Sequence, residues 1–116
     1  MSKKRRDTDF LTDVIEAAER SLQYTKGLTR KKFMSDKKSQ DAVVRNLEII
    51  GEATKNLSNS LKTKYPAIPW KNIAGLRDKL IHFYFGIDYN IVWNIVRKEL
   101  PKIGKQLREI LVKETE

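Results

Sequence analysis

The stretch "DAVVRNLEIIGEATKNLS", residues 41–58, decides the fold class. Its mostly apolar stripe advances in steps of three and four residues, the spacing that gathers side chains on one face of an α-helix. The stripe consists of Val43, Leu47, Ile50, Thr54 and Leu57, and it continues to Leu61. We expect this helix to begin after Ser35 or Asp36. Gly51 lies inside the stripe, where a glycine costs about 1 kcal/mol relative to alanine, so it indicates close packing against another helix.

Towards the N-terminus, "DTDFLTDVIEAAERSLQYTKG", residues 7–27, carries a second helical stripe. Thr8 or Asp9 can cap its start, and Gly27 suits its end. The "LTRKKFMSD" that follows predicts a short basic connection with two apolar anchors, Phe33 and Met34.

Towards the C-terminus, "KYPAIPW" ends the helix that begins near residue 36, because proline disfavours its continuation. "WKNIAGLRDKLIHFYFGID", residues 70–88, follows helical steps; Gly75 can divide it into a short turn and a helix from about Leu76, with Gly86 as the stop. The last helix should begin near Asp88, and Pro101 should kink it or divide it in two.

These patterns predict an all-α fold. Alternating strand patterns and Asn-Gly or Asp-Gly hairpin turns are absent from the sequence. Four or five helices joined by short links indicate an up-and-down bundle. We expect residues 1–7 to form a basic flexible N-terminal tail and residues 8–116 to form a single helical domain.

The composition narrows the classes of function. The 116 residues include 24 Lys+Arg and 15 Asp+Glu, a net charge of +9, which makes a polyanionic partner plausible. There is no cysteine and only one histidine, so thiolate chemistry is excluded, and we expect neither a metal centre nor a cofactor. No apolar run of 18 residues or signal-peptide core occurs, so we expect a soluble, cytoplasmic protein without a membrane partner.

The single histidine, His82, lies in "RDKLIHFY", residues 77–84. On a straight helix, Arg77 and Tyr84 share nearly one face, whereas His82 lies about 140° round from Arg77. Asp78 and His82 are spaced i, i+4 and can touch. Arg77 and His82 can meet if the helix loosens near Gly86, or if a second copy of the chain brings its motif opposite the first.

RNA chemistry favours the second copy. Metal-free cleavage by the neighbouring 2′-hydroxyl needs a base, an acid for the departing 5′-oxygen, and a cation for the crowded phosphorane. A two-fold dimer offers two copies of His82 and two of Arg77 in one cleft. The simpler alternative is that His82 and Tyr84 are packing residues of an apolar helix and that Asp78 is an ordinary helix charge.

The same residues resemble a known family. Arg77 to Tyr84 matches the R-x4-H-x-Y signature of HEPN domains, in particular the HepT-like toxins of HEPN/MNT toxin–antitoxin modules. The "GEA" step at residues 51–53 and the flanking "IPW", "GLR" and "GID" also resemble that family. The resemblance covers nearly the whole chain after its basic start.

The resemblance implies a homodimeric helical bundle that acts as a metal-independent endoribonuclease. It implies that Arg77 and His82 form the catalytic pair, and the i, i+4 spacing suggests that Asp78 supports His82. It further implies a cognate nucleotidyltransferase antitoxin of the MNT type, which can transfer AMP to Tyr84. Negative charge and bulk there would block the RNA phosphate.

Two other functions fit the sequence. The chain could be a non-catalytic nucleotide- or RNA-binding partner subunit of a minimal nucleotidyltransferase, or a plain helical scaffold. Toxicity on expression that is lost with His82→Ala would distinguish the enzyme from both. No base-reading module is visible, so the sequence leaves the choice between transfer RNA and messenger RNA open.

Overall fold

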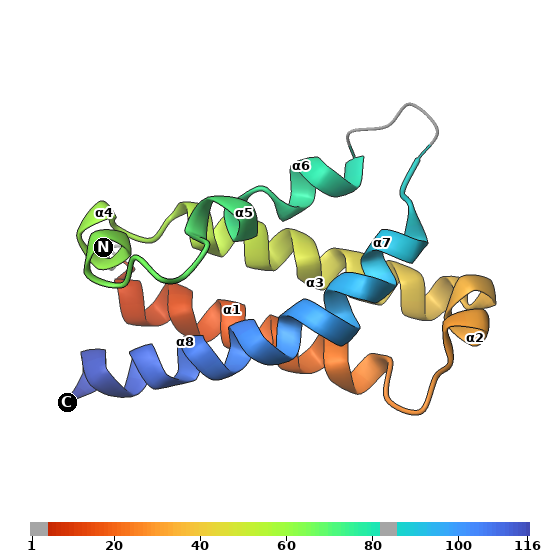
Figure 1. Ribbon diagram of the computed structural model, residues 1–116, viewed down its shortest axis with the longest axis horizontal. Helices are drawn as coiled ribbons and strands as arrows, with labels where there is room; N and C mark the ends of the chain where they lie inside the picture. Colours follow the sequence, from red (N-terminus) through yellow and green to blue (C-terminus); the bar gives the residue numbers. More distant parts are fainter. Residues whose placement is uncertain (1–4, 82–85) are drawn as a thin grey trace.

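The computed structural model describes residues 5–81 and 86–116, apart from the side chains of Arg77 and Ile81. All regular secondary structure in these residues is helical: α1 (Asp7–Tyr24), α2 (Arg30–Ser35), α3 (Lys37–Lys55), α4 (Asn59–Lys64), α5 (Trp70–Ala74), α6 (Leu76–Ile81), α7 (Tyr89–Asn94), the π-helical η1 (Ile95–Glu99) and α8 (Leu100–Thr115). Helix α1 runs opposite to α3 and α8, which lie along it (Figure 1). The predicted all-α bundle is confirmed.

The core lies where α1 meets α3 and α8. Leu11 and Val14 of α1, Leu47 of α3 and Leu107 of α8 are all fully buried. Burying one such side chain contributes about 1.5–3 kcal/mol relative to leaving it in water. The helical stripes recognised in the sequence are therefore the faces that hold the bundle together.

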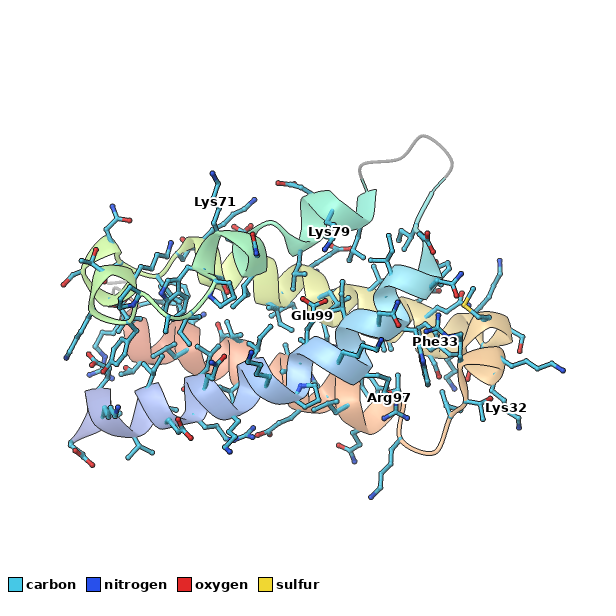
Figure 2. All side chains as sticks on the ribbon, in the orientation of Figure 1. Lys32, Phe33, Lys71, Lys79, Arg97 and Glu99 are labelled. Carbon is cyan, nitrogen blue, oxygen red and sulfur yellow. The ribbon has the colours of Figure 1, made fainter. Side chains whose placement is uncertain are left out.

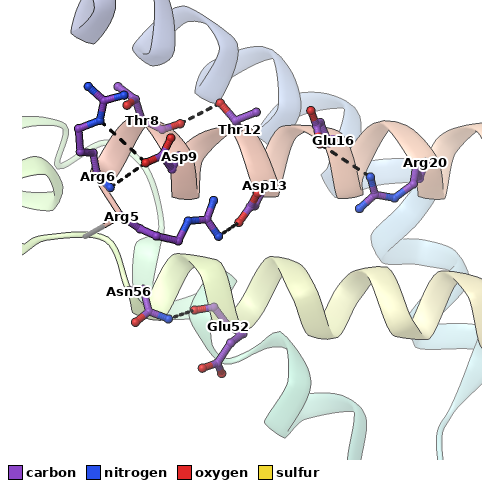
Figure 3. A network of polar contacts seen from close by, with 10 residues as sticks. All are labelled: Arg5, Arg6, Thr8, Asp9, Thr12, Asp13, Glu16, Arg20, Glu52 and Asn56. Carbon is purple, nitrogen blue, oxygen red and sulfur yellow. Dashed lines mark hydrogen bonds and ion pairs between the residues drawn. The ribbon is translucent and has the colours of Figure 1, made fainter. Parts of the chain in front are cut away.

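Helix α1 begins at Asp7, the last residue of the segment expected as a tail; residues 1–4 lie outside the described part. The N-cap residue is Arg6, not Thr8 or Asp9. The Asp9 carboxylate accepts a 2.9 Å hydrogen bond from the Arg6 backbone N–H, as Figure 3 shows. Arg5 forms a 2.8 Å ion pair with Asp13, and this hydrogen bond raises the pKa of the Arg5 guanidinium.

The predicted basic connection is wrong in part, because Arg30–Ser35 forms helix α2. The Thr29 hydroxyl caps it by accepting a 3.1 Å hydrogen bond from the Lys32 N–H. Phe33 is a true anchor: it is fully buried, with its ring centroid 5.3 Å from that of Trp93. Met34 is 39% exposed and anchors little. A six-residue helix with one buried side chain has no period that a sequence could reveal.

The long stripe of residues 43–61 spans two helices rather than one. Ser58 interrupts it by capping α4, where its hydroxyl accepts a 3.1 Å hydrogen bond from the Leu61 N–H. The Ser58 N–H and hydroxyl also donate to the Asp7 carboxylate at 2.8 and 2.5 Å. Leu57 and Leu61 remain buried at 3% exposure, so the stripe is preserved across the break.

Pro101 is accommodated by the π-helical turn η1 that precedes it, and the helical path α7–η1–α8 continues through it (Figure 1). Proline has no backbone N–H to donate to the turn before it, and its ring crowds the carbonyl four residues earlier. A wider turn relieves that contact. No described helix is both long enough and apolar enough to cross a membrane.

Candidate active site

The segment that leads into the motif is held by Trp70, the first residue of α5. Its indole N–H donates a 2.9 Å hydrogen bond to the Tyr65 carbonyl, and its backbone N–H donates one of 2.8 Å to Ile68. Pro69 occupies the N-cap position, so its missing N–H costs nothing there. The "IPW" sequence thus fixes the direction in which α5 leaves the turn.

Gly75 divides the segment, and the predicted start of a helix at Leu76 is confirmed; its predicted end at Gly86 depends on residues 82–85, which lie outside the described part. The Gly75 N–H closes α5 on the Lys71 carbonyl at 3.0 Å, and the Gly75 carbonyl accepts from Lys79 at 3.0 Å. A Cβ at residue 75 would lie 3.3 Å from the Lys71 oxygen, closer than most side chains tolerate. Glycine therefore permits a tight junction between α5 and α6.

Helix α6 has a buried face and an exposed face. Leu76 and Leu80, spaced i, i+4, are 4% and 2% exposed and fix the helix on α3. Asp78 and Lys79 are exposed. The helix is therefore anchored by two leucines while its polar residues face outward.

The predicted site residues fall partly outside this description. Arg77 lies in α6, but its side chain is outside the described part, and so are His82 and Tyr84 entirely. Asp78 is exposed on α6. The structure thus places Arg77 and Asp78 on one anchored helix, and the contact between them and His82 stays a prediction.

Beyond the motif, Gly86 and Asp88 determine how the chain enters helix α7. Gly86 has φ +95°, a backbone conformation that favours glycine. The Asp88 carboxylate caps α7 by accepting a 2.9 Å hydrogen bond from the Asn90 N–H. The predicted start of the last helix near Asp88 is confirmed.

Two arginines make contacts with helix α7 that the sequence did not predict. Arg30 donates to the side-chain oxygens of Asn90 and Asn94 at 2.9 and 2.8 Å. Arg97 donates to the Thr25 carbonyl at 2.8 Å and lies 4.9 Å from the Trp93 ring centroid. These partners are uncharged, and within the described residues neither guanidinium group forms an ion pair. Only contacts distant in sequence reveal them.

Residues 5–81 and 86–116 contain no group of three His, Cys, Asp or Glu side chains placed to hold a metal ion. The predicted absence of a metal centre stays a prediction.

Comparison with known proteins identifies the family. The model of the family described as "Ribonuclease HepT-like" matches residues 14–110. A Methanocaldococcus jannaschii protein named "putative RNase" is 49% identical over 102 residues, covering 88% of this chain and 84% of its own length. The "probable ribonuclease HepT" of Thermococcus cleftensis is 46% identical over 107 residues, covering 92% and 97%. No solved structure gave a significant match. The chain therefore belongs to the HepT-like ribonuclease family of HEPN domains, as the motif at residues 77–84 predicted.

Proposed function

We propose that this chain is a metal-independent endoribonuclease and the toxin of a HEPN/MNT toxin–antitoxin pair. The observation that carries the proposal is the family match over residues 14–110, which includes the complete R-x4-H-x-Y motif. Several relatives that match this chain over most of their length are named as ribonucleases, which supports the proposal. The net charge of +9 suits an RNA substrate.

The chemistry assigned to the motif is transesterification within RNA. One His82 takes the proton of a 2′-hydroxyl, whose oxygen bonds to the adjacent phosphorus. The bond from phosphorus to the 5′-oxygen breaks, and a second His82 protonates that oxygen. Arg77 pairs with the phosphorane oxygens through its planar fork. Asp78 orients His82. The products are a cyclic phosphate and a free 5′-hydroxyl.

A shared dimer cleft follows from the supply of histidine. One chain has a single histidine, whereas the reaction needs a base and an acid at once. The exposure of Asp78 and Lys79 supports this arrangement, because the polar face of α6 is left uncovered by the described parts of its own chain. In the proposed dimer, each chain contributes one Arg77 and one His82 to the cleft.

A nucleotidyltransferase antitoxin provides the proposed control. Transfer of AMP from ATP joins the Tyr84 phenolic oxygen to the α-phosphorus and releases pyrophosphate. The added phosphate and nucleoside would occupy the place of the RNA phosphate and repel it. Switching the toxin off therefore needs no unfolding.

The test of catalysis is RNA cleavage by the purified chain in excess EDTA. We expect His82→Ala and Arg77→Ala each to reduce the rate at least about 100-fold, the usual size of a lost acid–base group. Each variant should melt within a few degrees of the wild type. Lys55→Ala, a charge removed from the exposed end of α3, is the control for a general effect of charge. Cleavage that survives both motif substitutions would refute the assignment.

The test of control is co-expression with the neighbouring nucleotidyltransferase gene. We expect the peptide containing Tyr84 to gain the mass of one or more AMP groups and the Tyr84→Phe chain to gain none. If the chain is only a partner subunit, it will bind the transferase, yet expression of the chain alone will not be toxic.

A further inference from the structure

We propose that a groove beside α6 binds the nucleotide next to the cleaved bond, with its phosphate on two lysines and its ribose hydroxyl on Glu99. The inference rests on the proposed function and adds a substrate subsite to it. The groove has a volume of about 450 Å³ and lies between α5–α6 on one side and η1–α8 on the other.

The floor of the groove is apolar. Ile73 of α5, Leu76 of α6 and Ile103 of α8 line it and are 2%, 4% and 7% exposed. These side chains belong to the hydrophobic core. The floor offers apolar contact to the face of a base, and such contact does not depend on which base it is.

The cations lie on the α5–α6 side. Lys71 and Lys79 line the groove and are exposed, and within the described residues neither forms an ion pair. In Figure 2, Lys71 lies on α5, where its side chain extends outward from the bundle, Lys79 lies on α6, and Glu99 lies on η1. A free ammonium group binds phosphate as a point charge, so this side of the groove suits the RNA backbone. Asn72 adds an amide donor at the same rim.

The opposite side carries the one acidic residue that lines the groove in the described part of the chain, Glu99. An ionised carboxylate only accepts hydrogen bonds and repels phosphate. A ribose 2′-hydroxyl can donate to it, and that hydroxyl distinguishes RNA from DNA. Glu99 ends the π-helical turn before Pro101, and π-turns of this kind occur often at functional sites.

The groove lies on the helix that carries the motif. Lys79 follows Arg77 by two residues, so the two positions lie about 160° apart round α6, which is only about 10–12 Å across with its side chains. A strand whose phosphate pairs with Arg77 can cross α6 and place a nucleotide close to the cleaved bond in the groove. An acidic protein segment could use the lysines, but it would gain nothing from Glu99.

The first test measures binding of a single-stranded RNA 12-mer by the full chain carrying His82→Ala, which leaves the RNA intact. Each neutralised phosphate contributes about 0.7 to the slope of log affinity against log salt for single strands. Because the two lysines share one phosphate, we expect Lys71→Ala with Lys79→Ala to lower that slope by about 0.7. The matched control removes Lys31 and Lys113, exposed lysines at opposite ends of the bundle, and should leave the slope nearly unchanged. The proposal is overturned if the slope falls equally in both double variants, or if it falls in neither of them.

The second test compares RNA with DNA of the same sequence in the same background. Glu99→Ala should lower the ratio of RNA to DNA affinity about fivefold, the value of one hydrogen bond near 1 kcal/mol. Glu109→Ala, an exposed carboxylate of α8, should not change the ratio. A ratio unaffected by Glu99→Ala overturns the assignment of the ribose. RNA cleavage that is independent of His82 would refute the proposed function, whereas an unchanged salt slope or an unchanged RNA-to-DNA ratio would refute the groove.

Discussion

Helix α3 contacts both α1 and α6, but the two contacts differ in length and in how much of the smaller partner is buried. The first is long and closed: Leu11 and Leu47 are fully buried between two helices of 18 and 19 residues. The second is six residues long, with two buried leucines and polar residues facing outward. Stability is concentrated in the long interface, whereas the short helix keeps its polar groups available to other molecules.

The strongest way to break this comparison is to damage the long interface. Leu47→Ala leaves a cavity among fully packed side chains, and we expect the free energy of unfolding to fall by about 2–5 kcal/mol. Denaturant titration followed by circular dichroism measures it. The rate of RNA cleavage per folded chain should change little at a temperature where the variant remains folded. A loss below 1 kcal/mol would mean that the interface is not the main source of stability.

The matching change on the short helix should slow cleavage and leave stability nearly unchanged. Asp78→Asn keeps the size of an exposed side chain, so we expect the free energy of unfolding to stay within about 0.5 kcal/mol. Cleavage should slow about tenfold, because the neutral amide orients His82 less well than the carboxylate does. Such a change corresponds to about 1.4 kcal/mol of transition-state stabilisation. Single-turnover kinetics measure this rate. An unchanged rate would show that Asp78 is an ordinary surface charge.

The link between α1 and α4 offers a smaller effect. Ser58→Ala removes the cap of α4 and a hydrogen bond to Asp7, and we expect a loss of about 1 kcal/mol in unfolding free energy. Ser60→Ala is the matched control, because Ser60 is exposed and has no hydrogen bond to another described side chain. Equal stability of the two variants would show that Ser58 does not cause the break between α3 and α4.

The smallest effect concerns pH and the C-terminal end of α8. Hydrogen bonds from Lys64 at 2.8 Å and from Tyr65 at 2.6 Å lower the pKa of Glu114 from its ordinary 4.5. A lowered folded pKa stabilises the fold above the unfolded value, and this contribution disappears as pH falls through the folded value. We expect Tm to fall on acidification below about pH 4.5. The difference in Tm between wild type and Glu114→Gln should shrink over that range; a constant difference would contradict the ionic account.

The sequence predicted the elements whose side chains repeat over several turns. The helices containing Leu47 and Leu107 were foreseen in this way, and so were the junction at Gly75 and the cap at Asp88, because glycine and aspartate act locally. The helix around Phe33 was missed because it is too short to show a period.

Two further features depend on contacts between distant residues. The break at Ser58 was hidden because the buried stripe continues across it, and its cause includes Asp7, 51 residues away. The positions of Arg30 and Arg97 depend likewise on partners far along the chain. Of the candidate site, residue types and spacing predicted the family, and the structure adds the anchoring of α6 by Leu76 and Leu80.

The shared cleft is the central claim, and a mixed dimer tests it most directly. One wild-type chain and one His82→Ala chain, carrying different affinity tags, are co-expressed, and the mixed dimer is purified through both tags. If one cleft needs both histidines as acid and base, its cleavage rate should fall close to that of the dimer with two His82→Ala chains. Retention of half the wild-type rate would mean that each chain acts alone. Failure to recover any mixed dimer, from a chain that still cuts RNA, would contradict the shared cleft outright.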